Sequence, residues 1–476
     1  MSRSEAMGMG RRERDRQDVL FVTAEQLPKS QGHAFYKRLN RLLSEAGFDR
    51  EVEKLCEPYY QPTGTRGRPS VPPGVYFRML MVGYFEGIGS QRGIAWRCAD
   101  SLSLREFLGV PLTEATPDHS TLSRVRDRLP LEVHQEVFRL VLQLAAQQGL
   151  LKGKTVAVDS TTLEADAAMK SIVRRDTGED WKAYVIGLMK KEGVIEKEDE
   201  PSDDEVRRFD KKRKNKKVSN AEWVSTTDPS ARITKLKDGR THLAYKAEHV
   251  VDIDTELILA AEVYHGDHSD TKTLCDSVME AQTHLSEAGL EAQIEEAVAD
   301  KGYHAAEQLE LVTSVGVRTY VPEPKRRGES RLSAKPVEQQ RAVKGNRRRT
   351  KTAKNKRLQR LRSERVERSF AHVCDTGGSR RTWLRGIDKV RKRLLTSALV
   401  RNLGLVMRKL FGIGTPRGLQ GEGGSAGLMQ LAWLLIAAMK NLWDTHARLG
   451  ARPTESRLQL LTVGGPQEYA LRSTGC

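Results

Sequence analysis

The sequence predicts an α/β protein: a mixed sheet flanked by helices, with an all-α region before it and a helical tail after it. Three observations predict this fold class. Residues 75–148 show helical patterns without a strand-like run. From residue 151 onward, short β-branched runs alternate with helical segments. After residue 411, a Gly-rich stretch precedes a single apolar helical pattern. Alternation of strands and helices is typical of a sheet covered by helices.

The first 60 residues are expected to form an N-terminal extension. The segment 1–20 is charged and predicted to be disordered, and the pattern from 25 to 60 is weakly helical. A Gly/Pro/Arg-rich linker at 61–73 leads into an apolar helix at 75–88. We expect shorter helices near 90–99 and 103–108, and a long amphipathic helix at 131–148 that Gly149 ends.

A further helix is predicted to begin at Pro117-Asp118-His119-Ser120, with Asp118 or Ser120 as its N-cap. Arg124 and Arg128 lie one turn apart on a face distinct from the apolar one. Such a helix could enter a DNA major groove, although a solvated surface helix fits the pattern equally well. We assign residues 61–150 to a helical DNA-binding domain.

Residues 151–410 carry the strands of the predicted sheet. The expected strands are 155–158, 242–251, 257–263, 294–299 and 318–321, with the second and third forming an antiparallel pair joined at 252–256. Helices are expected at 271–288, 305–313, 358–372 and 394–411. Residues 165–240 interrupt the apolar pattern with acidic and basic runs, which predicts a surface insertion. The remaining residues, 411–476, are predicted to form a linker and an apolar helix at 428–442.

The charge of the chain points to a polyanionic partner. The net charge is +17 and the pI is about 9.6, a balance common in proteins that bind nucleic acid. The segment 325–365 holds seventeen Lys and Arg against three Glu. A solvated surface is the alternative interpretation of such a run. The expected DNA-contacting residues, besides those of the helix after Pro117, are Arg347, Arg348, Arg349, Lys351, Lys354, Arg365 and Arg368.

Other site classes receive little support. The five cysteines show no CxxC and no zinc-ligand spacing, so disulfide and zinc frameworks are not expected. The N-terminus lacks the apolar region of a signal peptide, and the longest apolar run, 428–439, is too short to cross a bilayer. We expect a soluble intracellular protein with no membrane partner.

Three carboxylates stand out by their context. Asp159 ends the first predicted strand, Asp300 ends a later strand, and Glu367 lies on an Arg-rich helix. Three carboxylates at one point repel each other unless a cation neutralises them, and Mg²⁺ or Mn²⁺ suits oxygen ligands and phosphate substrates. Two such ions, roughly 3.5–4 Å apart, can activate a water molecule and stabilise the leaving oxygen in an in-line phosphoryl transfer.

Three local motifs resemble those of the DDE transposases of bacterial insertion sequences, which have an RNase H-like catalytic domain. They are Val156-Ala157-Val158-Asp159-Ser160-Thr161, Asp300-Lys301-Gly302-Tyr303, and Arg365-Val366-Glu367-Arg368-Ser369-Phe370. The stretch 71–130 is similar to the helical domain that precedes such catalytic domains. The resemblance covers roughly residues 60–410.

The resemblance implies that Asp159, Asp300 and Glu367 form a metal-binding catalytic triad, with two Mg²⁺ or Mn²⁺ ions. It implies a transposase that binds the terminal inverted repeats of its element as a homodimer on double-stranded DNA. Such an enzyme cleaves DNA and joins the freed 3′-OH to target DNA without a covalent enzyme intermediate.

The chain departs from the family pattern around Glu367. Many relatives carry basic residues four positions before and seven after this glutamate, where the chain has Ser363 and Cys374. Arg362, Arg365 or Arg368 could take their place. Glu364, one helical turn from Glu367, is the alternative third ligand, and an ion pair with a nearby Arg is the non-catalytic interpretation of either glutamate.

Two other functions remain open from the sequence. A related nuclease would hydrolyse DNA without joining strands, and an inactive transposase derivative would bind DNA as a repressor. An RNA-binding protein has no support, because no aromatic stacking motif is present. The sequence does not indicate the terminal-repeat or target sequence, or whether excision passes through a hairpin.

Overall fold

The computed structural model describes residues 32–61, 70–196, 198, 200–213, 219–235, 239–324 and 332–419. They lie in one compact unit, 1–419. The predicted C-terminal helix at 428–442 lies outside the described residues, as does the charged segment 1–20. In the described part of the chain, no helix is long and apolar enough to cross a membrane.

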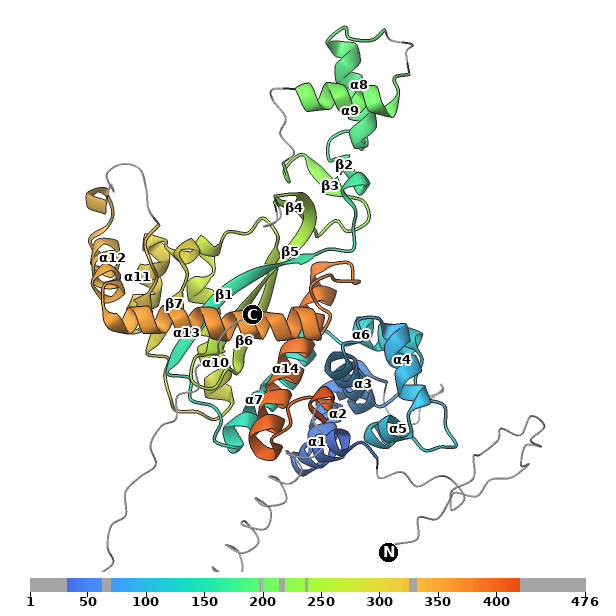
Figure 1. The fold of residues 1–476 in the computed structure, drawn as a ribbon, viewed down its shortest axis with the longest axis vertical. Helices are drawn as coiled ribbons and strands as arrows, with labels where there is room; N and C mark the ends of the chain where they lie inside the picture. The colour runs from blue at the N-terminus through green and yellow to red at the C-terminus, as the bar shows by residue number, and fades with distance from the viewer. Residues whose placement is uncertain are drawn as a thin grey trace, which may run out of the picture. The chain divides into compact units, whose positions relative to one another are not determined.

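The first part of the unit consists of helices only (Figure 1). Their bounds are α1 Ala34–Glu45, α2 Phe48–Cys56, α3 Pro73–Glu86, α4 Gln91–Asp100, α5 Leu102–Leu108, α6 His119–Arg128 and α7 Leu131–Gln147. The helix α3 is buried on nearly every side because other helices surround it. The helices α1 and α2 fall within the region expected to be an extension, and their apolar residues join the same core.

The second part contains a six-stranded mixed sheet. Its strands are β1 Thr155–Glu164, β4 Arg232–Lys235, β5 Thr241–Asp252, β6 Ile258–His265, β7 Glu296–Ala299 and β8 Arg318–Tyr320. The order is β4-β5-β1-β7-β8, with β6 also paired to β5. The strands β1, β7 and β8 are parallel, while β4 and β6 pair with β5 in the antiparallel sense, as β5 does with β1. The predicted α/β class and the predicted β5–β6 pair are confirmed.

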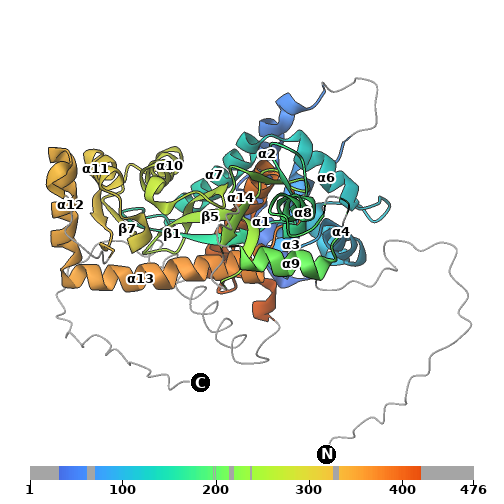
Figure 2. The same ribbon diagram turned by 90° about the horizontal axis from the view of Figure 1, so that it is seen from above.

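Helices cover both faces of this sheet (Figure 2). On one side lie α10 Leu274–Glu287 and α11 Ala306–Ser314, and on the other lies α13 Ala353–Phe370, which packs against β1, β5 and β7. A short π-helical segment, Ala371–Thr376, follows α13. The long helix α14 Ile387–Phe411 packs against α3, α7 and β6. Where α14 meets β6, the side-chain amide of Asn402 forms hydrogen bonds with both the N–H and the C=O of Ile258. These bonds satisfy backbone groups of the strand.

The predicted insertion, 165–240, is largely folded. It contains a two-stranded sheet, β2 Ile172–Arg174 with β3 Trp223–Ser225, and two helices, α8 Trp181–Lys191 and α9 Asp203–Lys212. The two helices share a small core of Val185, Met189 and Val206. In Figure 1 this pair of helices projects away from the six-stranded sheet. It therefore adds a surface feature without entering the main core.

The basic segment 325–365 is more regular than its sequence indicated. Most of its described part forms α12 Val337–Thr350 and the first two-thirds of α13, which begins five residues before the predicted start at 358. The charged side chains of α12 hide a short apolar face, since Ala342 and Val343 are buried. We missed α12 because the charge run obscured this pattern.

Candidate active site at the ends of two parallel strands

Asp159 and Asp300 are brought together by the pairing of β1 with β7. Val158 pairs with Ala299 in a parallel register, and each aspartate is the next residue along its own strand. Neighbouring strands lie about 4.8 Å apart, so the two carboxylates start from adjacent backbone positions. The sequence predicted both strand ends, and the structure places them side by side.

The Asp159 side chain faces α13. Its carboxylate accepts a hydrogen bond and an ion pair from Arg362 and a 2.8 Å hydrogen bond from the Ser160 main-chain N–H. Burial raises its pKa, and the negative charge of Asp300 raises it further, while Arg362 and the Ser160 amide oppose these effects. Burial therefore disfavours the ionised form of Asp159, and nearby positive charge favours it.

Asp300 is held by the turn that follows it. Its Oδ1 accepts a 2.7 Å hydrogen bond from the Gly302 N–H and caps a short 3-10 turn, Lys301–Tyr303. Tyr303 is fully buried, and its hydroxyl donates a 2.7 Å hydrogen bond to Glu248 on β5. The second-aspartate motif is thus tied to the neighbouring strand through its tyrosine.

A buried polar network lies on the opposite face of the sheet from α13. Ser160 donates a 2.9 Å hydrogen bond to Asp270, which forms a 2.5 Å ion pair with Lys246. The Lys246 ammonium also lies 3.6 Å from Glu248, to which Thr273 and Ser277 donate hydrogen bonds. The network connects Ser160, which follows Asp159, to Tyr303, three residues after Asp300. It was missed in the sequence, because nothing in the alternating pattern of β5 marks Lys246 and Glu248 as buried.

Glu367 does not join the two aspartates in this structure. It is exposed on α13, and its Oε1 accepts a 2.8 Å hydrogen bond from Ser363 one turn earlier. The alternative, Glu364, is also exposed and forms a 2.7 Å ion pair with Arg368. Among the residues that the structure describes, no three His, Cys, Asp or Glu side chains are grouped closely enough to hold a metal ion.

The donor set nevertheless suits a hard divalent cation. Asp159 and Asp300 supply carboxylate oxygens from adjacent strand ends, and their mutual repulsion is the condition that a cation relieves. Arg362 partly fills that electrostatic role for Asp159. Of the three arginines considered as replacements for the basic residues of the family pattern, Arg362 is the one that contacts either of the two strand-end aspartates.

The predicted DNA-contacting residues fall into two groups. Arg124, Arg128, Arg348 and Lys351 are exposed, and Arg128 lies over the ring of Tyr60. The others form ion pairs or hydrogen bonds with residues outside their own helix. Arg347 pairs with Glu323, Arg349 bonds Thr319, Lys354 pairs with Glu296, and both Arg365 and Arg368 pair with Glu256.

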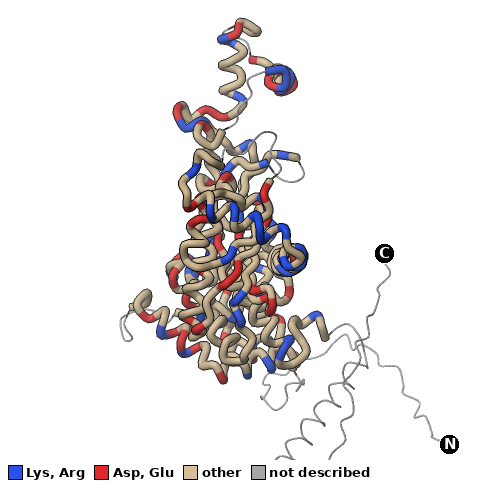
Figure 3. Tube along the Cα trace, turned by 90° about the vertical axis from the view of Figure 1, so that its left-hand side faces the viewer, with Lys and Arg blue, Asp and Glu red and all other residues tan. Residues whose placement is uncertain are grey.

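The exposed cations give α12 and α13 a basic outer surface. Besides Arg348 and Lys351, its exposed members are Arg341, Lys344, Lys354, Lys356, Arg357 and Arg360. In Figure 3, where α13 is seen nearly end-on at the right of the trace, Lys and Arg are concentrated around this helix. This surface includes the outer side of α13, the helix that supplies Arg362.

Comparison with known protein families gives two matches. Residues 22–128 match a family model described as a transposase domain (DUF772), and residues 152–403 match one described as a transposase DDE domain. The second match alone covers more than half of the 476 residues. Searches of curated proteins and of solved structures found no match.

Proposed function

Because the chain belongs to the DDE transposase family, we propose that it binds the terminal inverted repeats of its own insertion sequence and catalyses both DNA cleavage and strand transfer. The observation that carries the proposal is the pair Asp159 and Asp300 at adjacent ends of parallel strands. The helix that packs over them belongs to a strongly basic surface.

Members of this family use divalent metal ions. Asp159 and Asp300 would hold Mg²⁺ or Mn²⁺ here, and we propose Glu367 as the third ligand, reached by a local change of its side chain or of α13. When bound, such ions activate the attacking oxygen and stabilise the leaving one. Two ions would fit the two-step chemistry of cleavage and joining.

The chain's own residues have distinct parts in this proposal. Arg362 orients the Asp159 carboxylate and favours its ionised form, because its guanidinium forms an ion pair with that carboxylate. The Gly302 amide and the Tyr303–Glu248 bond hold Asp300. Exposed cations of α12 and α13 would bind the DNA backbone, and α6, with Arg124 and Arg128, would contribute to recognition of the element ends.

We further propose that the protein acts as a homodimer on double-stranded DNA in the bacterial cytosol. We assign end recognition to residues 61–150, catalysis to 151–410, and a linker and helix to 411–476. An enzyme that brings two element ends together needs two sites, which favours a pair of subunits.

A strand-transfer assay tests this function. The full chain, a DNA bearing the element ends, a target plasmid and Mg²⁺ are expected to yield cleaved ends and joined product. Asp159→Asn and Asp300→Asn are expected to abolish both products while DNA binding persists, because each change keeps the size of the side chain and removes only its charge. Cleavage without joining would instead identify a nuclease. Binding without either product in the unchanged protein would identify a DNA-binding repressor.

A further inference from the structure

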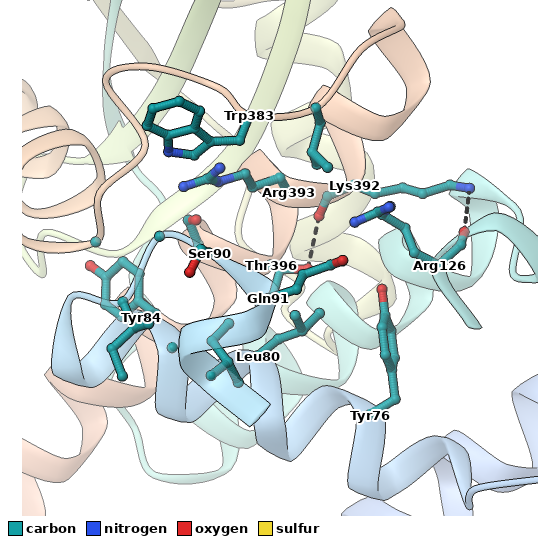
Figure 4. A pocket seen from close by; sticks show the side chains of 17 residues that line it. Tyr76, Leu80, Tyr84, Ser90, Gln91, Arg126, Trp383, Lys392, Arg393 and Thr396 are labelled. Carbon is teal, nitrogen blue, oxygen red and sulfur yellow. Dashed lines mark hydrogen bonds between the residues drawn. The ribbon is translucent and has the colours of Figure 1, made fainter. Parts of the chain in front are cut away.

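A second site is indicated where the helical region meets the catalytic region. A cavity of about 260 Å³ lies between α3, α4 and α6 on one side and α14 with the loop before it on the other. Figure 4 shows Arg126 from α6 and Lys392 and Arg393 from α14 around this cavity, with Trp383 at its edge. The cavity thus lies between the segments that match the two family models.

The lining of the cavity contains three cations and no carboxylate. Arg126 and Lys392 are only 9% and 8% exposed. Burial, together with the charge of Arg126, lowers the pKa of Arg393 to about 10, and burial also lowers the pKa of Lys392. The charge of Arg126 lowers the pKa of both Arg393 and Lys392, and an anion is the group that would relieve this repulsion.

Arg126 is poorly satisfied within the described residues. Its Nε is buried and donates no hydrogen bond there, and its nearest carboxylate, Asp127, lies 3.7 Å away outside the lining. Lys392 and Arg393 donate to main-chain oxygens, of Arg126 and Gly378 respectively. These bonds hold Lys392 and Arg393 in place without adding negative charge. The carboxylates that act on these cations, Asp127 on Arg126 and both Asp127 and Asp388 on Lys392, lie outside the lining, which leaves Arg393 as the cation with no acidic partner among the described residues.

The remaining lining combines aromatic and apolar side chains with the polar residues Ser90, Gln91, Thr396 and Ser397. Tyr76, Tyr84, Leu80 and Ile94 form walls. Trp383 is 56% exposed. A Cβ atom added at Gly89 would lie 3.6 Å from Trp383 Nε1 and 3.7 Å from Arg393 Nη2, so an indole donor and a guanidinium converge at this glycine. A ligand with an anionic group and a planar ring would match both parts of the cavity.

We propose that this cavity binds one nucleotide unit, with its phosphate between Arg126 and Arg393 and its base against Trp383. The volume is slightly below the roughly 300 Å³ at which small-molecule pockets begin, which suits a single nucleotide and excludes a duplex. The nucleotide is either free or part of a single DNA strand, since both present the same phosphate and ring. Occupation would strengthen the contact between the helical and catalytic regions.

The proposal does not rest on the proposed function, because binding can be measured without cleavage. The full chain in EDTA is titrated with dTMP, thymidine and inorganic phosphate, and thermal unfolding and tryptophan fluorescence are recorded. We expect dTMP to raise the Tm and to bind at least tenfold more tightly than thymidine or phosphate. Trp383→Phe is expected to remove the fluorescence change. Equal affinity for dTMP and thymidine would overturn the assignment of the phosphate site.

Arg126→Gln is the informative variant, with Arg385→Gln as its control. Removal of one of three repelling cations is expected to leave the ligand-free protein at least as stable while weakening dTMP binding tenfold or more. Arg385 is 59% exposed, pairs with Asp166 and does not line the cavity, so its variant should bind dTMP normally. Unchanged dTMP affinity in Arg126→Gln would refute the proposal.

The source of the nucleotide is distinguished by competition. If a 5′-phosphorylated single-stranded oligonucleotide produces the same Trp383-dependent fluorescence change and displaces dTMP, the site takes a DNA strand. If it leaves bound dTMP in place, the site takes a free nucleotide. If neither ligand gives a Trp383-dependent change, the cavity is not a nucleotide site.

Discussion

Arg362 on α13 forms an ion pair with Asp159 on β1, although the two residues lie 203 positions apart in the chain. The pair links the helix that carries the proposed third ligand to the strand that carries the first. It also supplies positive charge to a carboxylate whose burial and neighbour, Asp300, favour the protonated form.

Arg362→Gln is expected to shift the pH dependence of DNA cleavage. The pKa of Asp159 is raised mainly by burial and is held down by Arg362, so loss of the guanidinium should raise it further. If cleavage requires ionised Asp159, the acidic limb of the pH profile should move to higher pH by about one to three units. The control is Arg360→Gln, an exposed arginine of the same helix. An unshifted acidic limb would show that the pair does not control this ionisation.

Glu367→Gln and Glu364→Gln should separate the two candidates for the third ligand. We expect the first to reduce cleavage by more than about a hundredfold, the upper range for residues that only support a metal ligand. The second removes an exposed ion pair with Arg368 and should change stability by no more than about 0.5 kcal/mol. Rates measured across a Mg²⁺ titration give the comparison. The reverse pattern would assign the role to Glu364.

Tyr303→Phe should destabilise the protein and impair cleavage together. The change removes a 2.7 Å hydrogen bond to Glu248, a carboxylate that is 1% exposed, and should cost about 1–3 kcal/mol in the free energy of unfolding. Tyr320→Phe is the matched control, because its hydroxyl donates to Glu296 at the other end of β7. Denaturant unfolding and cleavage rates should show a loss of stability in both variants. The loss of cleavage should be confined to Tyr303→Phe.

Arg348→Gln and Lys351→Gln should lower the salt dependence of DNA binding. Each exposed cation that contacts a phosphate contributes about one unit to the slope of log K against log[salt]. Arg349→Gln should mainly affect stability, because Arg349 donates two hydrogen bonds to Thr319. Lys409→Gln, at the exposed end of α14, serves as the control. Identical slopes in all variants would place the DNA on another surface.

His249 should make the protein sensitive to acid. It is fully buried, hydrogen-bonds Ser369 and stacks on Phe370 at 4.1 Å, and burial lowers its pKa to about 3. The unfolded chain takes up this proton near pH 6.5 and the folded chain does not. Stability is therefore fully present above that pH, and as pH falls from there toward 3 the free energy of unfolding should drop by up to about 1.4 kcal/mol per unit.

Denaturant unfolding at several pH values checks this expectation. The variant His249→Asn should be less stable at neutral pH and should lose less stability between pH 6.5 and 4 than the unchanged protein. A second buried histidine, His134, has a pKa lowered to about 4 by burial and should account for part of the remaining slope. Equal slopes in the two proteins would contradict the role of His249.

Local signals in the sequence predicted a large part of this fold. Asp118 was one of two candidate N-caps, and its carboxylate accepts the Thr121 amide at the start of α6. The strands that end at Asp159 and Asp300 were visible as short β-branched and apolar runs. These features depend on residues that are close together in the chain, so a single sequence is enough to predict them.

Contacts between distant segments were not predictable in the same way. Which arginine meets Asp159 depends on how α13 crosses the sheet, so the sequence left Arg362 as one of three candidates. Lys246 and Asp270 are 24 residues apart, on β5 and just before α10, and their ion pair exists only once these elements pack. The position of Glu367 relative to the two aspartates likewise depends on the rotation of α13.

The burial of α14 has a consequence for how this protein can change over evolution. The helix is apolar or buried along most of its length, since α7 and α3 cover one part of it and β6 another. A helix shared in this way prevents the two halves from being exchanged as independent modules. A new end-recognition region acquired by recombination would have to match the α14 surface before it could recognise any DNA.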